Sequence, residues 1–364
     1  MILAFIADGR STHTQKWIEY FAQNGHEVHL ITYDPMNRTI RGVNEYVIAS
    51  RWKNLYISFI PRYLSIKSLI KKIKPDLIHA HFITKYGFHL VGIGIYPKIV
   101  SAWGDDVLIL PKKSWLIYEF TRKVLLTTDL IFSDSQDITN HVITDFNIPA
   151  GKIRFLPIGT DTDLFSPGNK HDTGGRTTIE IFSNRGFFPV YDLKTLVEGF
   201  ALAYQKDPRF RLTLKGEGPD EQKIRNLVAS LGISEVVRFK KKTDYTEVPY
   251  DYRNADIFIS TSISDGIPVS IQEAMASGLP CIVTAVGGIP ELIENEKNGI
   301  LISRGSSQQL AEGLLKLGRD STLLSQLGTA ARETIIEHFQ WNTLMAQAEK
   351  DYQALIKTYR QDRS

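Results

Sequence analysis

The sequence is poor in cysteine and in long apolar runs, and each shortage excludes a class of protein. The single cysteine among 364 residues, Cys281, leaves no partner for an intramolecular disulfide and cannot build a cysteine-based zinc cage. The apolar run at the N-terminus turns polar at Asp8, which makes it too short for a signal peptide. No stretch reaches the roughly 18 apolar residues of a membrane-spanning helix. These shortages predict a cytoplasmic protein whose contact with a membrane, if any, is peripheral and at the inner face.

The sequence also lacks a strong excess of charge of either sign. Its 43 basic and 40 acidic residues give a net charge of +3, too small to indicate nucleic-acid binding. Hydrophobic residues make up 43% and charged residues 23%, as in ordinary soluble globular proteins, which excludes disordered and low-complexity classes. A chain of this length can form two domains, each with a buried core.

What the sequence does contain is an alternation of short apolar runs and helical patterns, typical of βα units with parallel sheets. In the first half, a helix is predicted over Thr14–Asn24, with Gly25 at the position of a C-cap glycine. The strands predicted in this half are Ile2–Ala7, Glu27–Thr32, Leu77–Ala80, Lys98–Ala102 and Leu130–Ser133.

The same alternation restarts after residues 166–175, which are turn formers without an apolar anchor and are predicted to be a linker. A last helical pattern, Asn342–Thr358, is long enough to return to the first domain. We therefore predict an N-terminal domain over residues 1–165, a C-terminal domain over 166–337, and a returning helix within 338–364. The strands predicted in the second half are Ile179–Ser183, Arg211–Lys215, Val236–Lys240, Ile257–Thr261 and Cys281–Thr284.

The most informative segment, residues 262–280, directly follows one of these strands. Gly266 and Pro268 indicate a tight turn that leads into a helix over Val269–Ser277, and Gly278 ends that helix. The first turn of a helix has unpaired N–H groups and the positive end of the helix dipole, so it binds phosphate well. The segment therefore predicts an anion-binding helix N-terminus at the carboxyl end of a strand.

Two carboxylates flank this helix start. Asp265 and Glu273 form an acid-x7-acid pattern, in which one carboxylate can reach a sugar hydroxyl while the other reaches a ribose. The segment resembles the family 4 retaining glycosyltransferases, whose usual motif is Glu-Gly-Phe-Pro-x4-Glu-Ala-Met-Ala-x-Gly-x-Pro. Asp265 replaces the first Glu of that motif and Ile267 the aromatic residue, as in a subset of the family that carries Ser-Asp-Gly. Residues 286–292 and 298–302 are also similar to the family.

The resemblance covers essentially the whole chain and implies the GT-B architecture, an α/β fold of two facing Rossmann-like domains with the active site in the interdomain cleft. It implies transfer of a hexose or N-acetylhexosamine from a nucleotide-diphosphate sugar to a hydroxyl of a glycan, lipid-linked or small-molecule acceptor. In the family the acceptor hydroxyl attacks from the face of the leaving group, so no protein nucleophile is expected. Neither a cofactor nor a metal ion is expected.

The resemblance also implies which residues act at the site. Arg185 would pair with the donor diphosphate, which suits a guanidinium. A lysine usually follows this arginine by five or six residues, but those positions hold Val190 and Tyr191, so the second cation is missing or comes from Lys194 or another lysine. The catalytic residues implied are Arg185, Asp265 (at the hexose) and His81 (facing the donor sugar). The donor-binding residues implied are Gly9, Gly216, Gly266, Ile267, Pro268, Val269, Ser270 and Glu273, the last at the ribose.

Three further patterns leave alternatives open. His79 and His81 share a face at a strand end, where two histidines can be metal ligands or simple packing. Trp103 stands where the family has the histidine of a His-Gly-x-Asp turn, and it is either structural or in contact with the acceptor. The Asp161-Thr162-Asp163 stretch looks like a metal-binding D-x-D, but it lies where the family has a Gly-Val-Asp stretch at the domain junction, so we expect no metal there.

Residues 51–74 combine seven Lys or Arg with large apolar residues, among them Trp52, Leu55, Tyr56, Phe59, Ile60, Tyr63 and Leu64, and contain no acidic residue. This composition fits either a solvated helix face or a patch that docks reversibly on an anionic membrane, where a lipid-linked acceptor would lie.

Two rival functions remain. A nucleotide-sugar 2-epimerase of the same architecture needs acid and base residues at the sugar and no acceptor, and the acid-x7-acid pattern argues against it. A catalytically silent nucleotide-sugar-binding protein is suggested by the missing lysine near Val190.

Overall fold

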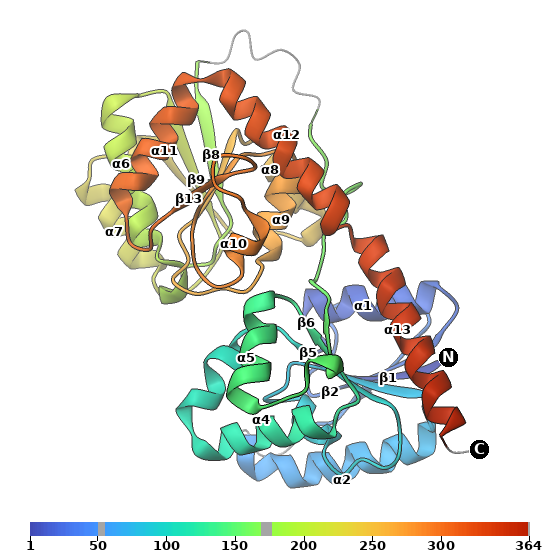
Figure 1. Cartoon of the computed structure of the whole chain (residues 1–364). Helices are drawn as coiled ribbons and strands as arrows, with labels where there is room; N and C mark the ends of the chain where they lie inside the picture. Colours follow the sequence, from blue (N-terminus) through green and yellow to red (C-terminus); the bar gives the residue numbers. More distant parts are fainter. Residues whose placement is uncertain (50–54, 169–176, 363–364) are drawn as a thin grey trace. The chain divides into compact units, whose positions relative to one another are not determined.

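The computed structural model describes residues 1–49, 55–168 and 177–362, which form two compact α/β units (Figure 1). Unit 1 consists of Met1–Pro157 and Leu344–Ser364, and unit 2 of Ile158–Thr343. The first boundary between the units therefore follows Pro157, whereas the sequence predicted it after residue 165. Of the predicted linker, only residues 166–168 are described, and they belong to unit 2.

The sheet of unit 1 is parallel throughout its described strands, in the order β3-β2-β1-β4-β5-β6-β7. Its central strands are near-continuous apolar runs, as expected of a sheet covered by helices on both faces. All five strands predicted for this half are present, and two edge strands join them. The strands are β1 (Ile2–Ile6), β2 (Glu27–Thr32), β3 (Val43–Val47), β4 (Leu77–His81), β5 (Lys98–Ala102), β6 (Leu130–Ser133) and β7 (Ile153–Phe155).

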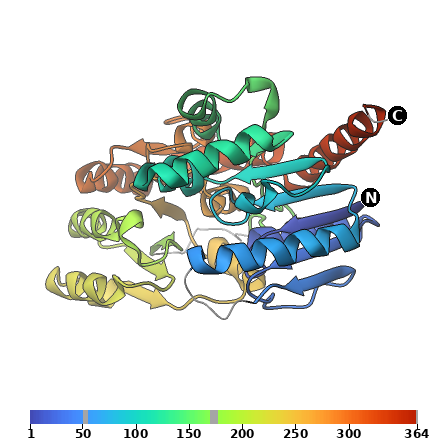
Figure 2. The same cartoon turned by 90° about the horizontal axis from the view of Figure 1, so that it is seen from below.

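Alternate residues of each strand face opposite helix layers. Ile6 and Ile78 belong to the core that includes Ile66 of α2 and Val124 of α4, and Figure 2 shows these two helices on the same side of the sheet. Among the described residues, no helix is both long and apolar enough to cross a lipid bilayer. The helices of unit 1 are α1 (Thr12–Gln23), α2 (Leu55–Ile73), α3 (Asp105–Leu108), α4 (Trp115–Thr127), α5 (Gln136–Phe146) and the short 3₁₀ turns η1 (Gly87–Leu90), η2 (Leu110–Lys113) and η3 (Ala150–Lys152).

The last helix, α13 (Trp341–Gln361), continues from unit 2 into unit 1, where it packs on the other face of the sheet. The ring of Tyr352 stacks on Phe21 of α1 with 4.8 Å between centroids and on Phe132 of β6 at 6.2 Å. The Tyr352 hydroxyl is also hydrogen bonded to Nδ1 of His79. The predicted helix over residues 342–358 is therefore present, and its second part completes the core of unit 1.

Unit 2 repeats the architecture with a parallel sheet in the order β10-β9-β8-β11-β12-β13. All five strands predicted for this half are present, and β13 joins them. The strands are β8 (Ile179–Ser183), β9 (Phe210–Lys215), β10 (Val237–Lys240), β11 (Ile257–Ser260), β12 (Cys281–Thr284) and β13 (Ile300–Ile302). The helices are α6 (Leu193–Lys206), α7 (Glu221–Ser230), α8 (Val248–Arg253), α9 (Val269–Ala276), α10 (Ile289–Leu292), α11 (Ser307–Arg319), α12 (Ser321–His338), η4 (Pro189–Tyr191), η5 (Ser234–Val236) and η6 (Tyr245–Glu247).

Candidate functional site

Two neighbouring strands of unit 2 bring together residues that are far apart in the sequence. Arg185 follows β8, and Asp265 lies in the loop between β11 and α9. Because β8 and β11 are paired and parallel, both loops leave the same edge of the sheet. The Arg185 guanidinium forms an ion pair with Asp265 and donates a hydrogen bond of 2.7 Å to the Ser270 hydroxyl. Three of the predicted site residues therefore form one cluster.

Tyr191 is a member of this cluster that the sequence analysis did not assign to the site. The Arg185 guanidinium carbon lies 4.1 Å from the centroid of its ring, a cation–π contact. The Thr261 hydroxyl donates to the Tyr191 carbonyl at 3.0 Å, which ties η4 to the end of β11. Tyr191 occupies one of the two positions where the family has lysine, so this chain supports its arginine with an aromatic ring at that place. Lys194, the suggested substitute, is exposed and lies 3.7 Å from Glu198 on α6.

Three consecutive residues at the end of β8 leave buried polar atoms unsatisfied. Ser183 Oγ, Asn184 Oδ1 and Arg185 Nε have no hydrogen-bond partner among the described residues. Buried polar atoms in native proteins nearly always have partners, so a group of orphans indicates a place where a ligand or water completes the network. These atoms lie at the carboxyl edge of the sheet, where open α/β sheets bind ligands.

Glu273 on α9 is almost completely buried and is held by two tyrosines. The Tyr245 hydroxyl donates to Oε1 at 2.8 Å, and the Tyr252 hydroxyl lies 3.1 Å from Oε2. Burial, followed by the charge of Glu273, raises the pKa of Tyr252 well above its usual value, so Tyr252 stays a hydrogen-bond donor. Asn184 in turn donates to the Tyr252 hydroxyl at 2.8 Å. Each carboxylate oxygen has two lone pairs and can accept more than one hydrogen bond.

The turn before α9 is built as the motif predicts. Pro268 is the N-cap residue, α9 begins at Val269, and Ile267 is buried in the core of unit 2. The loop after β12 packs so closely on this turn that a Cβ at Gly287 would lie 1.8 Å from the carbonyl oxygen of Asp265. Only glycine fits at position 287, because a side chain there would collide with the Asp265 carbonyl oxygen.

The remaining glycines of unit 2 that are predicted to bind the donor also lie in loops. Gly266 is buried in the turn before α9. Gly216 follows β9 and donates its N–H to the Lys240 carbonyl at 3.0 Å. The preceding residue, Lys215, is buried in an ion pair with Asp251. Neither Lys215 nor Lys194 is thus an unpaired cation.

In unit 1, the strand-end histidines differ in how well they are satisfied. His79 is hydrogen bonded through both ring nitrogens, to Tyr352 and, at 2.8 Å, to Ser101. His81 uses Nδ1 with the Thr14 hydroxyl at 3.1 Å, whereas its Nε2 is buried without a partner among the described residues. Burial, together with the charge of His13, lowers the pKa of His81 to about 3, so its ring is neutral at ordinary pH. His81 therefore keeps one buried ring nitrogen without a partner among the described residues, whereas both ring nitrogens of His79 are hydrogen bonded.

Asp106 is a buried carboxylate that the sequence analysis did not single out. Its Oδ1 accepts from the N–H groups of Trp103 and Gly104, both at 3.1 Å, and its Oδ2 accepts from Ile83 at 2.8 Å. Burial raises its pKa to about 6 in spite of these backbone hydrogen bonds. Asp106 stands at the Asp position of the His-Gly-x-Asp turn, and that match could have indicated it in the sequence. Asp106 fixes the loops beside His81, whose ring centroid lies 4.8 Å from that of Trp103.

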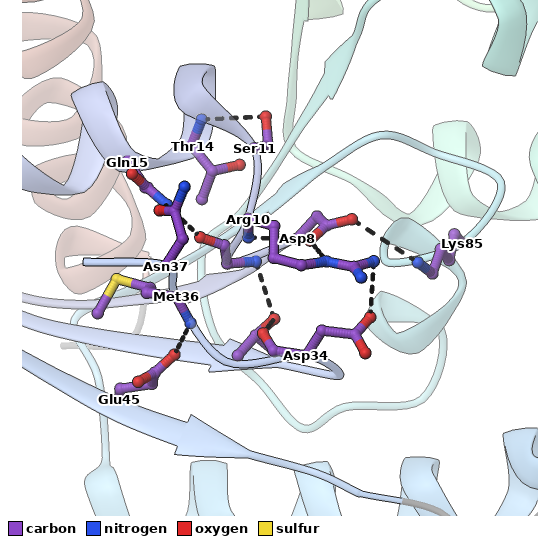
Figure 3. A network of polar contacts seen from close by, with 12 residues as sticks. Asp8, Arg10, Ser11, Thr14, Gln15, Asp34, Met36, Asn37, Glu45 and Lys85 are labelled. Atoms are coloured by element: carbon purple, nitrogen blue, oxygen red, sulfur yellow. Dashed lines mark hydrogen bonds and ion pairs between the residues drawn. The ribbon is translucent and has the colours of Figure 1, made fainter. Parts of the chain in front are cut away.

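Gly9 follows β1 in a tightly packed loop, between Asp8 and Arg10, which Figure 3 labels. Its N–H donates to the Thr32 hydroxyl at 2.9 Å, and a Cβ at this position would lie 2.9 Å from the Asp34 carbonyl oxygen. The Gly9 amide is thus already paired in this structure, and the side chains of Asp8 and Arg10 beside it carry the charge of the loop.

The D-x-D stretch caps a turn. Oδ1 of Asp161 accepts from the N–H groups of Asp163 and Leu164, both at 3.0 Å. Within the described ranges, no group of three or more His, Cys, Asp or Glu side chains could hold a metal ion.

Two helices of unit 1 that lie on the same side of the sheet carry exposed apolar and basic side chains (Figure 2). On α2, Ile60 and Leu64 are 66% and 58% exposed, and on α4, Trp115 and Leu116 are 72% and 60% exposed. Arg51, Trp52 and Lys53 of the predicted patch lie outside the described residues. The exposed cations beside these helices are Lys71, Lys72, Lys74, Lys112, Lys113 and Lys123. We call these four apolar and six basic residues the α2–α4 surface.

Comparison with known proteins identifies relatives of both units. Residues 170–334 match the family described as glycosyl transferases group 1, and residues 2–135 match the family described as glycosyl transferase 4-like. A GDP-mannose-dependent alpha-(1-6)-phosphatidylinositol monomannoside mannosyltransferase of Mycobacterium tuberculosis is 26% identical over 267 residues, which is 68% of this chain and 67% of that one. The N-acetyl-alpha-D-glucosaminyl L-malate synthase of Bacillus anthracis is 24% identical over 92% of this chain and 91% of its own.

Among solved structures, the Anabaena protein HepE in complex with UDP has the same fold, with a TM-score of 0.79 and 16% identity. The alignment covers 97% of this chain and 100% of HepE. The fold is therefore that of the two-domain GT-B proteins, as the sequence predicted.

Proposed function

We propose that this chain, which belongs to the family 4-like glycosyltransferases, moves a hexose or N-acetylhexosamine from a nucleotide-diphosphate sugar to an acceptor hydroxyl with retention of anomeric configuration. The observation that carries the proposal is the Arg185 cluster. A guanidinium supported by Tyr191 lies beside the Ser270 hydroxyl in the first turn of α9, next to three buried polar atoms without partners among the described residues.

The chemistry of this cluster suits a departing nucleoside diphosphate. Negative charge builds on the diphosphate as the bond to the sugar breaks, so catalysis depends on preorganised positive groups. Arg185 and the N–H groups of the first turn of α9 supply them. The Arg185 charge is balanced by Asp265, and a diphosphate that takes the guanidinium would release Asp265 for the sugar hydroxyls. Neutral His81 accepts from or donates to a sugar hydroxyl through its unpartnered Nε2, and no protein nucleophile takes part.

The relatives support a nucleotide-sugar donor without deciding which one. HepE has been solved with UDP and with UDP-glucose, and the mycobacterial relative is named for GDP-mannose. A thermal-shift screen with UDP-, GDP- and ADP-sugars, followed by NMR of the product anomer formed from the donor that binds, tests the proposal. A retained anomer is expected. An inverted anomer would refute retention.

Two alternatives on the same architecture are separated by products. A 2-epimerase converts the donor sugar without any acceptor, and a silent binding protein leaves the donor intact. We expect transfer over both, because the acid-x7-acid pattern argues against an epimerase and the Arg185 cluster would neutralise a departing diphosphate. We expect the wild type to release nucleoside diphosphate. Arg185→Ala should lose about 2–4 kcal/mol of transition-state stabilisation, because one preorganised charge donor is removed. Turnover of Arg185→Ala within threefold of the wild type would exclude this role.

Metal independence is part of the proposal, because Arg185 and a helix N-terminus replace the divalent ion that neutralises diphosphate in other enzymes. Activity should persist in excess EDTA. A complete loss that magnesium or manganese restores would contradict it and would return attention to Asp161 and Asp163.

Membrane contact is the last part of the proposal. The α2–α4 surface has the exposed large apolar side chains and the surrounding lysines of a surface that binds anionic lipid. Reversible contact with the inner face of a membrane would bring unit 1 to a lipid-linked acceptor. The protein is then cytoplasmic and peripheral.

A further inference from the structure

A second charged cluster lies in unit 1, at the carboxyl edge of β1, β2 and β4. Asp8 and Arg10 follow β1, Asp34 follows β2, and Lys85 follows β4. Figure 3 shows the four side chains directed toward one another. Arg10 lies 3.0 Å from Asp34 and 3.6 Å from Asp8, and Lys85 reaches Asp8 only at 4.0 Å. The sheet order places β1 between β2 and β4, so this edge is the point where the strand order reverses and where open α/β sheets bind ligands.

An arginine of α2 joins this cluster without an acidic partner among the described residues. The Arg62 guanidinium carbon lies 4.0 Å from the centroid of the Tyr33 ring, and Lys85 Nζ lies 5.3 Å from the same centroid. Arg62 donates to the Ser58 hydroxyl at 3.0 Å, but its Nε is buried without a partner in the described part of the chain. Three cations thus meet two acids, and the surplus charge lies at Arg62 and Lys85.

A buried hydroxyl adds a further unused donor. Tyr86 is 2% exposed, and its hydroxyl has no hydrogen-bond partner within residues 1–49, 55–168 and 177–362. Burial, followed by the charge of Asp8, raises the pKa of Tyr86 above its usual value, so the hydroxyl stays protonated. Lys85 Nζ lies 4.7 Å from the centroid of the Tyr86 ring. Arg62 Nε, Lys85 Nζ and the Tyr86 hydroxyl can each donate a hydrogen bond.

The backbone that carries these donors is held in an unusual conformation. The chain turns directly after His81 at Phe82, whose φ of 71° is rare for a bulky side chain. The Ile83 N–H is held by buried Asp106 at 2.8 Å. These contacts fix the segment that carries Lys85 and Tyr86. It follows His81 closely in the sequence, and the Nε2 of His81 has no partner among the described residues.

We propose that Arg62, Lys85 and the Tyr86 hydroxyl bind an anionic oxygen group, carboxylate or phosphate, of the acceptor, so that the acceptor is an acidic sugar or polyol and not a neutral one. The inference rests on the proposed transferase function and names the acceptor class. Guanidinium and ammonium groups give charge-assisted hydrogen bonds to either anion.

Lysine labelling tests the proposal without requiring activity. The wild-type protein is acetylated in the presence of glucuronate, glucose 1-phosphate, methyl glucoside, UDP or GDP, with ionic strength held constant by KCl, and the modification of Lys85 is followed by mass spectrometry. Glucuronate or glucose 1-phosphate should slow acetylation of Lys85 at least threefold, whereas methyl glucoside should not. Lys357, an exposed lysine of α13, serves as the internal control. The carboxylate and phosphate probes show which anion the site takes.

Protection should disappear in Arg62→Met and persist in the matched variant Arg41→Met, since Arg41 is an exposed arginine of the same unit. Three results would overturn the proposal: no protection by either anionic sugar, protection by UDP or GDP equal to theirs, or protection that survives Arg62→Met. Nucleotide protection would assign the cluster to the donor. Donor turnover without protection of Lys85 would refute this inference alone, whereas protection without any donor turnover would refute the transferase proposal and leave an anion site.

Discussion

At the scale of single residues, the position of Arg185 depends on a ring that replaces an expected cation. The Tyr191 centroid lies 4.1 Å from the guanidinium carbon. A desolvated cation–π contact contributes about 1–2 kcal/mol. We expect Tyr191→Ala to lower kcat/KM roughly 5- to 30-fold, the range that this energy implies, and Tyr191→Phe to keep nearly full activity because the ring remains.

Steady-state kinetics with the donor found by thermal shift measure this effect. Tyr250→Ala is the matched control, because Tyr250 is an exposed tyrosine of the same unit. Equal losses in Tyr191→Ala and Tyr250→Ala would contradict the supporting role.

The two carboxylates of the acid-x7-acid pattern should act on different parts of the donor. Glu273→Gln should weaken binding of the free nucleoside diphosphate, because a ribose hydroxyl loses a charged acceptor worth roughly 1.5–3 kcal/mol. Asp265→Asn should leave that binding nearly unchanged and weaken only the intact donor. Calorimetry with both ligands separates the roles. Equal losses for both variants and both ligands would show that the roles are misassigned.

A fold measurement must accompany Glu273→Gln, because this side chain also accepts from Tyr245 and Tyr252. The amide keeps only one acceptor oxygen, so part of any loss reflects those tyrosines. Tyr245→Phe removes one of these contacts and leaves the carboxylate. The nucleotide affinity of Tyr245→Phe therefore shows how much of the Glu273→Gln effect comes from losing the tyrosine contact and how much from losing the carboxylate.

At the scale of helices and strands, the sequence predicted the helix ends that proline and glycine determine, but not the short or exposed strands at the sheet edges. Pro268 and Gly278 mark the start and end of α9 because proline and glycine act on the backbone itself. β3 was not predicted because three of its five residues are exposed, so it has no apolar run. β13 was missed because its three residues are too short a run to signal a strand.

The candidate site could be predicted only in part for a related reason. Arg185 and Asp265 were found through motifs, yet nothing near them in sequence indicates that they pair across eighty residues. Tyr245 and Tyr252 lie in η6 and α8, where no local pattern points to Glu273. Those contacts follow from sheet order, which brings separate loops to one edge, and so they became visible only in the fold.

The α2–α4 surface carries a prediction at the same scale. Lysines near an anionic surface contribute roughly 1 kcal/mol each, and salt screens that attraction. Co-sedimentation with anionic vesicles should fall between about 50 and 500 mM salt. It should weaken when Lys71, Lys72 and Lys74 become Gln and when Trp115 and Leu116 become Ser.

A variant of unit 2 with Lys241→Gln, Lys242→Gln and Tyr250→Ser is the control, because it removes exposed cations and an exposed ring elsewhere. If the wild type remains in the supernatant at low salt, the α2–α4 surface is an ordinary solvated face.

At the scale of the whole molecule, buried histidines set the response to acid. Burial is the largest cause that lowers the pKa of His81 to about 3 and those of His13 and His89 to about 4. These residues bind protons near pH 6.5 when unfolded, so the unfolded state gains protons first as pH falls. Stability is therefore full above pH 6.5 and is lost below it, by roughly 1 kcal/mol per histidine for each pH unit.

Asp106 acts in the opposite direction, because its raised pKa of about 6 makes the folded state hold a proton longer than the unfolded state between about pH 4 and 6. One carboxylate offsets only one of the histidines. Urea unfolding at pH 7.5, 6.0 and 5.0 should show the midpoint of the unit 1 transition moving to lower urea concentration as the pH falls. In His13→Gln the midpoint should change less with pH. Greater stability of unit 1 at pH 5.0 than at pH 7.5 would contradict this balance.

The division of the chain has a consequence for biosynthesis. Unit 2 is one continuous stretch, so it can fold as soon as it leaves the ribosome, whereas unit 1 begins the chain and receives its last helix only after all of unit 2 has been made. Until Tyr352 arrives, the ring of Phe21 and the Nδ1 of His79 have no cover from α13. We expect nascent chains halted before residue 344 to be held by chaperones through this face, because α13 can cover it only after unit 2 has been made.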